Sequence, residues 1–169
     1  MDGDWKAGGP CSFAAVRRAD GSNTKGTKTR RARRKGTKML TLHSDLPPEL
    51  ENIAYRSIGC SIDVHRIVGA GYREIIYQRA MCLALDAAGL AFEAEKPVMV
   101  RYHQWEIPGH KLDIVVGGLV LLELKAVPRL KPIHTSQVKS YLKAGQLRLG
   151  LLMNFNVAVM REGIKRVVL

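Results

Sequence analysis

The stretch "LDIVVGGLVLLELKAV", residues 112–127, combines the pattern of a β-hairpin with three charged side chains. Two apolar runs flank a Gly-Gly pair, which is typical of a tight hairpin turn. Asp113 lies in the first run, and Glu123 and Lys125 lie in the second. Burying a charge in a sheet is unfavourable unless the charge is paired or binds a metal. The three charged residues are therefore candidates for a functional site.

The length of the turn decides whether the three charges share one face of the hairpin. The glutamate and the lysine are two residues apart, so on a strand they point to the same side. A two-residue turn at Gly117-Gly118 would place the aspartate on the opposite face. A three-residue loop over 116–118, with a left-handed second glycine and a bulge, would pair Val115 with Leu119 and bring all three charges onto one face. We predict the three-residue loop.

Two carboxylates on one sheet face make a binding site for a hard divalent cation such as Mg²⁺. A lysine beside them can orient a water, help to deprotonate it, or stabilise charge that develops on a phosphate. We therefore interpret the hairpin as the centre of a metal site. The structural alternative is a salt-bridge cluster, in which Asp113 and Glu123 pair with Lys125, Lys111 or Arg101.

The elements around the hairpin predict an α/β fold. Early antiparallel strands that a crossover helix joins to a later strand indicate a mixed central β-sheet flanked by α-helices. The predicted elements, in order, are a helix ending near Gly69, a helix within 72–90, a strand over 96–107, the two hairpin strands, a helix over 135–144, and strands within 147–155 and 161–169.

Two local details follow from the same patterns. Pro108-Gly109 is predicted to form the turn that ends the first strand. Apolar spacing predicts the buried face of the second helix. That face comprises Ile76, Ala80, Leu83, Ala84 and Ala87.

The arrangement D-x(n)-E-x-K on adjacent strands resembles the core of the PD-(D/E)XK nuclease superfamily, with Leu112 in place of the usual proline. The segment "GYREIIY", 71–77, resembles the G-x-x-E-x-x-Y signature of the bacterial GxxExxY family, a branch of that superfamily, and "SIDVHRIVGAG", 61–71, resembles its lead-in. "QVKSY", 137–141, resembles the last motif of RecB-like nucleases, and 123–137 resembles the segment that joins the E-x-K strand to that helix.

The resemblance implies a restriction-endonuclease-like core and metal-dependent hydrolysis of phosphodiester bonds, in DNA more than in RNA. Asp113 and Glu123 would hold Mg²⁺, or Mn²⁺, and Glu74 would support the metal through a water. Lys125 would act on the nucleophilic water, and Gln137 would help to orient the substrate. We expect the nucleic acid itself to be held by Arg73, Arg129, Lys131, His134, Lys139 and Tyr141.

Positive charge is concentrated at the start of the chain. The net charge is +12, and residues 1–44 carry eleven Lys or Arg and three Asp, which gives +8 in that segment. A segment with this much charge buries too little apolar surface to offset its ordering entropy. We therefore predict a disordered basic arm over 1–44 and a folded domain over 45–169. The arm either holds phosphate backbones without specificity or is a dispensable extension.

Other features bound the location and the partners. No apolar run approaches the ~20 residues that cross a bilayer, and the N-terminus lacks the pattern of a signal peptide. Three scattered cysteines form no metal-binding or disulfide pattern. We expect a cytoplasmic protein without a membrane partner, and a homodimer is one option for its oligomeric state. Two alternatives to a nuclease stay open: a non-catalytic nucleic-acid-binding module on a nuclease fold, and a structural or assembly protein.

Overall fold

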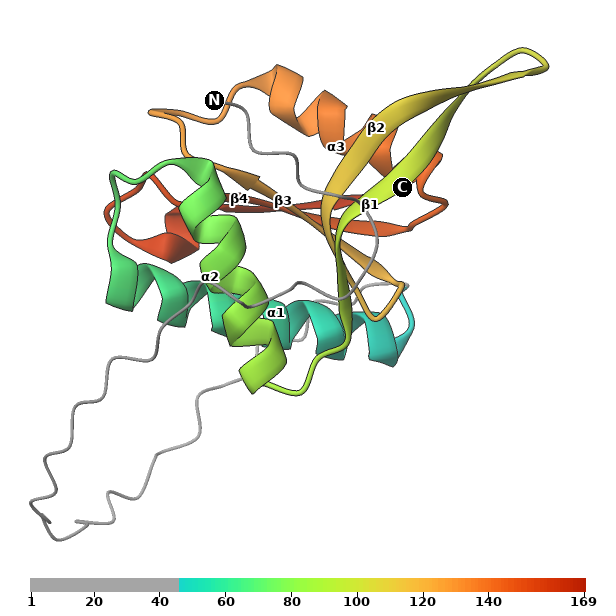
Figure 1. Ribbon diagram of the computed structural model, residues 1–169. Coiled ribbons are helices and arrows are strands. Elements are labelled where there is room, and N and C mark those ends of the chain that lie inside the picture. Colours follow the sequence, from blue (N-terminus) through green and yellow to red (C-terminus); the bar gives the residue numbers. More distant parts are fainter. Residues whose placement is uncertain (1–45) are drawn as a thin grey trace, which may run out of the picture. The chain divides into compact units, whose positions relative to one another are not determined.

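The computed structural model describes residues 46–169, which form one compact unit from Leu46 to Leu169. The predicted arm, 1–44, lies outside the described residues. The elements are α1 (Pro48–Val68), α2 (Glu74–Ala87), β1 (Phe92–Tyr102), β2 (Trp105–Val116), β3 (Val120–Lys125), α3 (Pro132–Ala144), β4 (Leu149–Asn154), the short 3₁₀ helix η1 (Met160–Gly163) and β5 (Ile164–Val168). Their order along the chain is the predicted order of helices and strands (Figure 1).

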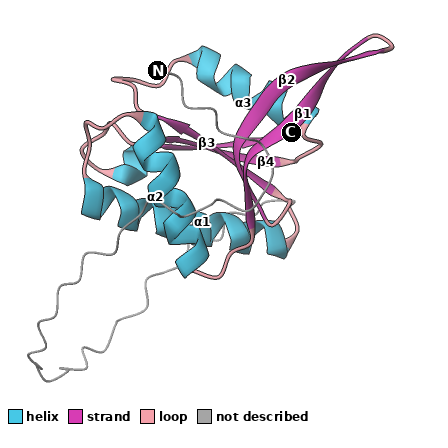
Figure 2. Cartoon of the chain, viewed as in Figure 1, coloured by secondary structure: helices cyan, strands magenta, loops and turns pink. Residues whose placement is uncertain are grey.

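The five strands form a single mixed sheet in the order β1-β2-β3-β4-β5. β1, β2 and β3 are antiparallel neighbours, β3 and β4 are parallel, and β5 is antiparallel to β4. A parallel pair needs a crossover connection, and α3 supplies it between β3 and β4. The mixed sheet flanked by helices confirms the predicted restriction-endonuclease-like α/β fold (Figure 2).

Side-chain alternation divides the interior into two cores, one on each face of the sheet. The larger core joins α1 and α2 to residues such as Ile114, Leu122 and Leu124. The smaller core joins α3 to Leu121 and Leu152. Two helices therefore cover one face, and α3 covers the other. Within residues 46–169, no helix combines the length and the apolar character needed to span a membrane.

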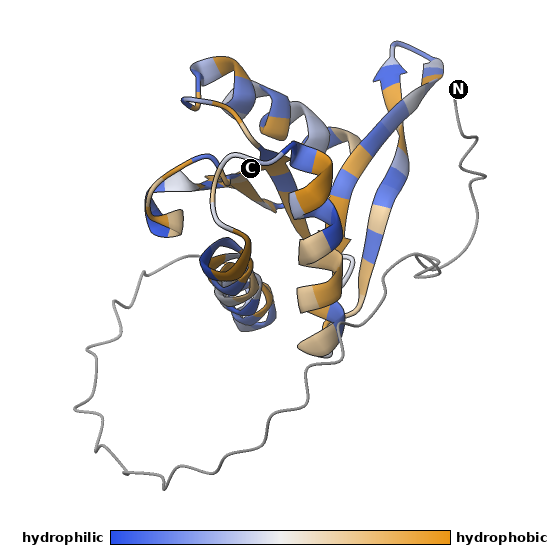
Figure 3. Ribbon diagram, turned by 60° about the vertical axis from the view of Figure 1, so that its left-hand side comes forward, coloured by the Kyte–Doolittle hydropathy of each residue, from blue (hydrophilic) through white to orange (hydrophobic). Residues whose placement is uncertain are grey.

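The predicted buried face of α2 is partly correct, because Ala80 and Ala84 pack against the larger core, but its centre is shifted by about one residue. Ile76 and Leu83 are 40% and 38% exposed, whereas Tyr77, Met81 and Leu85 are fully buried. The helix is apolar around most of its circumference, as its colouring in Figure 3 shows, so spacing alone does not select one face. Packing selects the face that carries the tyrosine.

The predicted turn at Pro108-Gly109 is also wrong. β1 and β2 form a long hairpin that reverses after Tyr102, which pairs with Trp105, and β2 runs through Pro108-Gly109. The register between the strands shifts between Val98 and Val100, opposite this dipeptide. A β-bulge accommodates a proline and a glycine with φ of 112°, so the pair marks a bulge in the strand rather than its end.

Candidate active site

The turn between β2 and β3 sets the register of the charged hairpin. Val116 pairs with Val120 and Ile114 with Leu122, so Asp113 and Glu123 occupy the next positions in this register, just beyond the last pair. The loop has the predicted length of three residues and the predicted parity, but it comprises residues 117–119 instead of 116–118. Gly117 and Gly118 both adopt positive φ, 60° and 69°, and the extra residue after them shifts the pairing by one.

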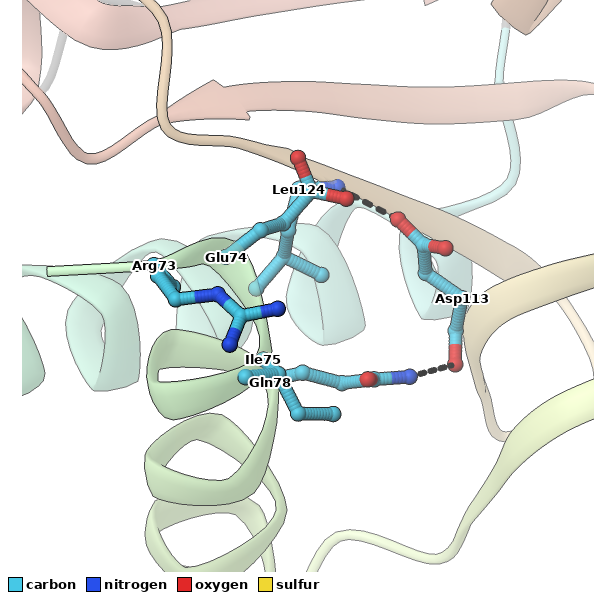
Figure 4. A pocket seen from close by; sticks show the side chains of 6 residues that line it. All are labelled: Arg73, Glu74, Ile75, Gln78, Asp113 and Leu124. Atoms are coloured by element: carbon cyan, nitrogen blue, oxygen red, sulfur yellow. Dashed lines mark hydrogen bonds between the residues drawn. The ribbon is translucent and has the colours of Figure 1, made fainter. Parts of the chain in front are cut away.

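Asp113 lies where β2 and β3 separate. The backbone pairing of the two strands ends at Ile114 and Leu122. Beyond that point the Leu124 N–H donates to Asp113 Oδ2 at 2.9 Å, so a carboxylate takes the place of a backbone acceptor (Figure 4). Gln78 of α2 donates a long hydrogen bond of 3.4 Å to the Asp113 carbonyl. The aspartate is thus fixed from both strands and from α2.

Glu123 and Lys125 form a close ion pair inside the sheet. Lys125 Nζ lies 2.6 Å from Glu123 Oε1, and the two side chains are 14% and 2% exposed. The other carboxylate oxygen, Glu123 Oε2, is buried and has no hydrogen-bond partner among the described residues. A buried carboxylate oxygen without a partner is costly, so this atom is suited to a proton or a cation.

Glu74 reaches the same region from the N-terminus of α2. The loop before it requires a glycine at Gly71, whose φ is 102°. The Tyr77 hydroxyl donates to the Gly69 carbonyl at 2.8 Å and accepts from the Tyr72 N–H at 3.1 Å. The Tyr77 ring is fully buried and stacks on Phe155. The glycine and the tyrosine of the G-x-x-E-x-x-Y segment therefore hold the loop that positions its glutamate.

A cleft of ≈ 270 Å³ opens between α2 and the hairpin. Figure 4 shows α2 bringing Arg73, Glu74 and Gln78 to one side of it, with Asp113 across from them. Ile75 and Leu124 complete the lining. The cleft thus gives solvent and ligands access to the carboxylates of Glu74 and Asp113, whereas Glu123 is buried behind it.

α3 covers the face of the sheet to which Glu123 and Lys125 belong, because these residues alternate along β3 with Leu122 and Leu124 of the larger core. Gln137 Nε2 donates to the Tyr141 hydroxyl, and the Tyr141 ring lies 4.1 Å from the His110 ring of β2, centroid to centroid. Burial raises the pKa of Tyr141. The nearby charges also act on it: those of Glu123 and Asp113 raise this pKa and that of Lys125 lowers it. Tyr141 therefore lies near the acidic cluster, and Gln137 is linked to the cluster through it.

The remaining predicted nucleic-acid contacts are spread around the site. Arg73 lines the cleft. His134 accepts a hydrogen bond from the Lys131 N–H at 3.2 Å, so it caps the start of α3. Lys131 and Lys139 line a second groove beside α3, and Arg129 is exposed in the loop before that helix.

Sequence patterns alone missed Asn154, His110 and Gln78. The Asn154 amide donates to the Val127 carbonyl at 2.8 Å and accepts from the Val127 N–H at 3.0 Å, which fixes the chain just beyond Lys125. A polar residue at the end of an apolar strand was the available signal for this clamp. Gln78 lies four residues after Glu74, on the same helical face.

Burial and mutual repulsion raise the pKa values of the acidic cluster. Burial raises the pKa of Glu123 to about 7, assisted by Asp113 and Glu74 and opposed by Lys125. Burial also raises the pKa of Asp113, against the Leu124 N–H, and that of Glu74, against the charge of Lys125. Burial lowers the pKa of Lys125, but its hydrogen bond to Glu123 and the negative charges of Glu123, Glu74 and Asp113 together outweigh burial, so the net shift is upward.

The donor set fits a divalent cation. When ionised, three carboxylates and one ammonium leave two uncompensated negative charges, and Glu123 Oε2 has no partner among the described residues. As the side chains stand, no three His, Cys, Asp or Glu within residues 46–169 are arranged to hold one metal ion. Mg²⁺ is commonly bound by only one or two carboxylates, with waters and substrate phosphates as its other ligands, so Asp113 and Glu123 suffice.

Comparison with known proteins agrees with this geometry. Residues 51–167 match the family model of the PD-(D/E)XK nuclease superfamily. This range runs from the first turn of α1 to the penultimate residue of β5. No curated protein and no solved structure matches the chain. The matched segment contains the hairpin with Asp113, Glu123 and Lys125. The chain therefore belongs to the PD-(D/E)XK nuclease superfamily.

Proposed function

We propose that the protein is a metal-dependent nuclease that hydrolyses phosphodiester bonds, with DNA as the preferred substrate and RNA as the second. We place it in the GxxExxY branch of the superfamily, on the strength of Gly71, Glu74 and Tyr77 and the structural task of each. The observation that carries the proposal is the hairpin register, which puts Asp113 and Glu123 opposite each other at the point where the strands separate.

Asp113 and Glu123 would hold Mg²⁺, for which Mn²⁺ could substitute, and Glu74 would support the ion through a water. When bound, such an ion polarises a phosphate and lowers the pKa of a coordinated water. Burial raises the pKa values of both carboxylates, and Asp113 raises that of Glu123 further. Protons therefore compete with a cation for this cluster below neutral pH.

Lys125 would act on the substrate and on the attacking water. Its ammonium is largely buried, which strengthens its interaction with charge on a phosphate oxygen. In hydrolysis, the water oxygen attacks phosphorus, one P–O bond to a sugar breaks, and a phosphate monoester and a hydroxyl group result. Gln137, together with Tyr141, would orient the substrate from the α3 side, and Arg73 would hold a phosphate at the mouth of the cleft.

Nucleic-acid binding without cleavage is the second candidate function. One observation favours it: the Lys125 ammonium is paired with Glu123 at 2.6 Å, so the lysine must exchange that partner for substrate or water before it can act. This candidate predicts binding that is steep in salt, without turnover in any divalent metal.

The test is cleavage of labelled DNA and RNA, single- and double-stranded, in Mg²⁺ or Mn²⁺. Lys125→Ala and Asp113→Ala are expected to lose at least about 100-fold in rate, the scale of a removed charge-stabilising group. Lys96→Ala is the matched control, because Lys96 also pairs with a glutamate at 2.7 Å, but on the surface. Equal cleavage by wild type, Lys125→Ala and Asp113→Ala would end the proposal.

A further inference from the structure

A second groove lies beside α3, away from the carboxylates. It has a volume of ≈ 390 Å³, and its walls are formed by α3, by the loop before α3 and by the edge strand β5. Its lining consists of Leu130, Lys131, Pro132, Thr135, Ser136, Lys139 and Lys165. Three ammonium groups and two hydroxyls thus face one hollow whose lining includes no carboxylate.

The groove and the candidate active site lie on opposite flanks of α3. Val138 is fully buried against the sheet. Gln137 and Lys139 precede and follow it, and residues two positions apart on an α-helix point in directions about 160° apart. Gln137 is linked to the acidic cluster through Tyr141, whereas Lys139 lines the groove. A ligand that occupies both places must therefore cross α3, whose width with side chains is about 10–12 Å.

The charges in the groove are available to an anion. Lys131, Lys139 and Lys165 take part in none of the ion pairs formed by residues 46–169. Lys131 and Lys139 are exposed on one side of the hollow, and Lys165 is exposed on the other. The sequence motifs do not include Lys165, because it belongs to the last strand and reaches the groove only through the sheet order.

We propose that this groove is a second phosphate-binding site, which holds the phosphodiester backbone of the nucleic acid at a point beyond the scissile linkage. The proposal rests on the nuclease function above. Lysine binds phosphate as a point charge, and the Thr135 hydroxyl adds a neutral donor, whereas the Ser136 hydroxyl donates to the Pro132 carbonyl at 3.4 Å. The substrate is then a polymer long enough to pass over α3 with one phosphate on each flank. Free inorganic phosphate or a nucleotide shares this chemistry and is the competing occupant.

The test measures binding of the full-length protein to a labelled 20-base-pair DNA in EDTA, over a series of salt concentrations. Each phosphate contact contributes about 0.9 to the slope of log K against log salt on duplex DNA. Lys139→Ala and Lys165→Ala are each expected to reduce the slope by about 0.9, and the double variant by about 1.8. The affinity for DNA falls between 50 and 200 mM salt, and each lost contact makes this fall smaller by a factor of about 3.5.

Arg66→Ala is the matched control, because it removes one exposed positive charge from α1, on the other face of the sheet. It is expected to leave the slope unchanged. A double variant with the wild-type slope and a wild-type melting temperature would overturn the proposal. So would calorimetry in which inorganic phosphate binds the wild type but not the double variant, while the DNA slope stays the same. The binding assay contains no metal, so its result does not depend on cleavage. A failure to cleave DNA in the separate assay with Mg²⁺ would refute the nuclease activity and leave this site untouched.

Discussion

The substitution Glu123→Gln is expected to stabilise the fold at alkaline pH and to abolish cleavage. Glu123 is 1% exposed, and burial, with Asp113 and Glu74 nearby, raises its pKa from 4.5 to about 7. The folded protein therefore binds this proton more tightly than the unfolded chain does. The stability that the proton confers is complete below the unfolded pKa of 4.5 and is lost as the pH rises through about 7.

The size of the effect follows from that shift. At about 1.36 kcal/mol per unit, the ionised carboxylate lowers the free energy of unfolding by about 3 kcal/mol at pH 8, relative to its protonated form. Glutamine is neutral at every pH, but Lys125 then loses a charged acceptor, which offsets part of the gain. We expect a net stabilisation on the order of 2 kcal/mol at pH 8, or about 5–10 °C in Tm, and little change at pH 4.5.

The assay is chemical denaturation of wild type and variant in EDTA at both pH values. Glu93→Gln is the control, because Glu93 pairs with Lys96 on the surface, where such a pair contributes only about 0–1 kcal/mol. If Glu123→Gln is instead less stable than wild type at pH 8, the pair with Lys125 is a structural salt bridge. The interpretation of the cluster as a metal site, in which the buried charge of Glu123 destabilises the metal-free fold, would then be wrong.

Three further outcomes are expected. Tyr77→Phe leaves two backbone groups without their hydroxyl partner, so it should lower the free energy of unfolding by about 1–3 kcal/mol in urea and slow cleavage; wild-type stability would contradict the role given to this hydroxyl. Gly163→Ala places a Cβ 2.2 Å from the Asn154 carbonyl oxygen, so urea denaturation should show a loss of about 1–3 kcal/mol, and an unchanged midpoint would refute the close approach. Mg²⁺ at 100 times its Kd should raise the free energy of unfolding of the wild type by about 2.7 kcal/mol at pH 8, and by less at pH 5. If the melting curve of Asp113→Asn still shifts with Mg²⁺, the ion binds elsewhere.

The sequence predicts most of the fold because its decisive features are local. Two continuous apolar runs around a glycine pair define the hairpin, and the spacing of Glu123 and Lys125 fixes their common face. The exact loop could not be predicted, since loops over 116–118 and 117–119 give the same parity and differ only in whether Val115 pairs with Leu119 or Val116 pairs with Val120. Parity sufficed to place Asp113 with the other charges.

The errors occurred where tertiary packing decides between equivalent local patterns. α2 is apolar on several sides, and only the burial of Tyr77 against Phe155 orients it. Pro108-Gly109 has turn chemistry, but the long pairing of β1 with β2 absorbs it as a bulge. Asn154, at the end of β4, binds the backbone of Val127, 27 residues earlier in the sequence, a contact that no local pattern encodes.

The most direct test of the central claim is the rate of Mg²⁺-dependent cleavage of labelled duplex DNA by wild type and by Lys125→Met. Methionine is unbranched and of similar length, so it fills the space of the lysine stem without the ammonium. We predict cleavage by wild type that EDTA abolishes, and a rate at least about 100-fold lower in the variant at unchanged fold. Cleavage at the wild-type rate by Lys125→Met, or cleavage that persists in EDTA, would contradict the account.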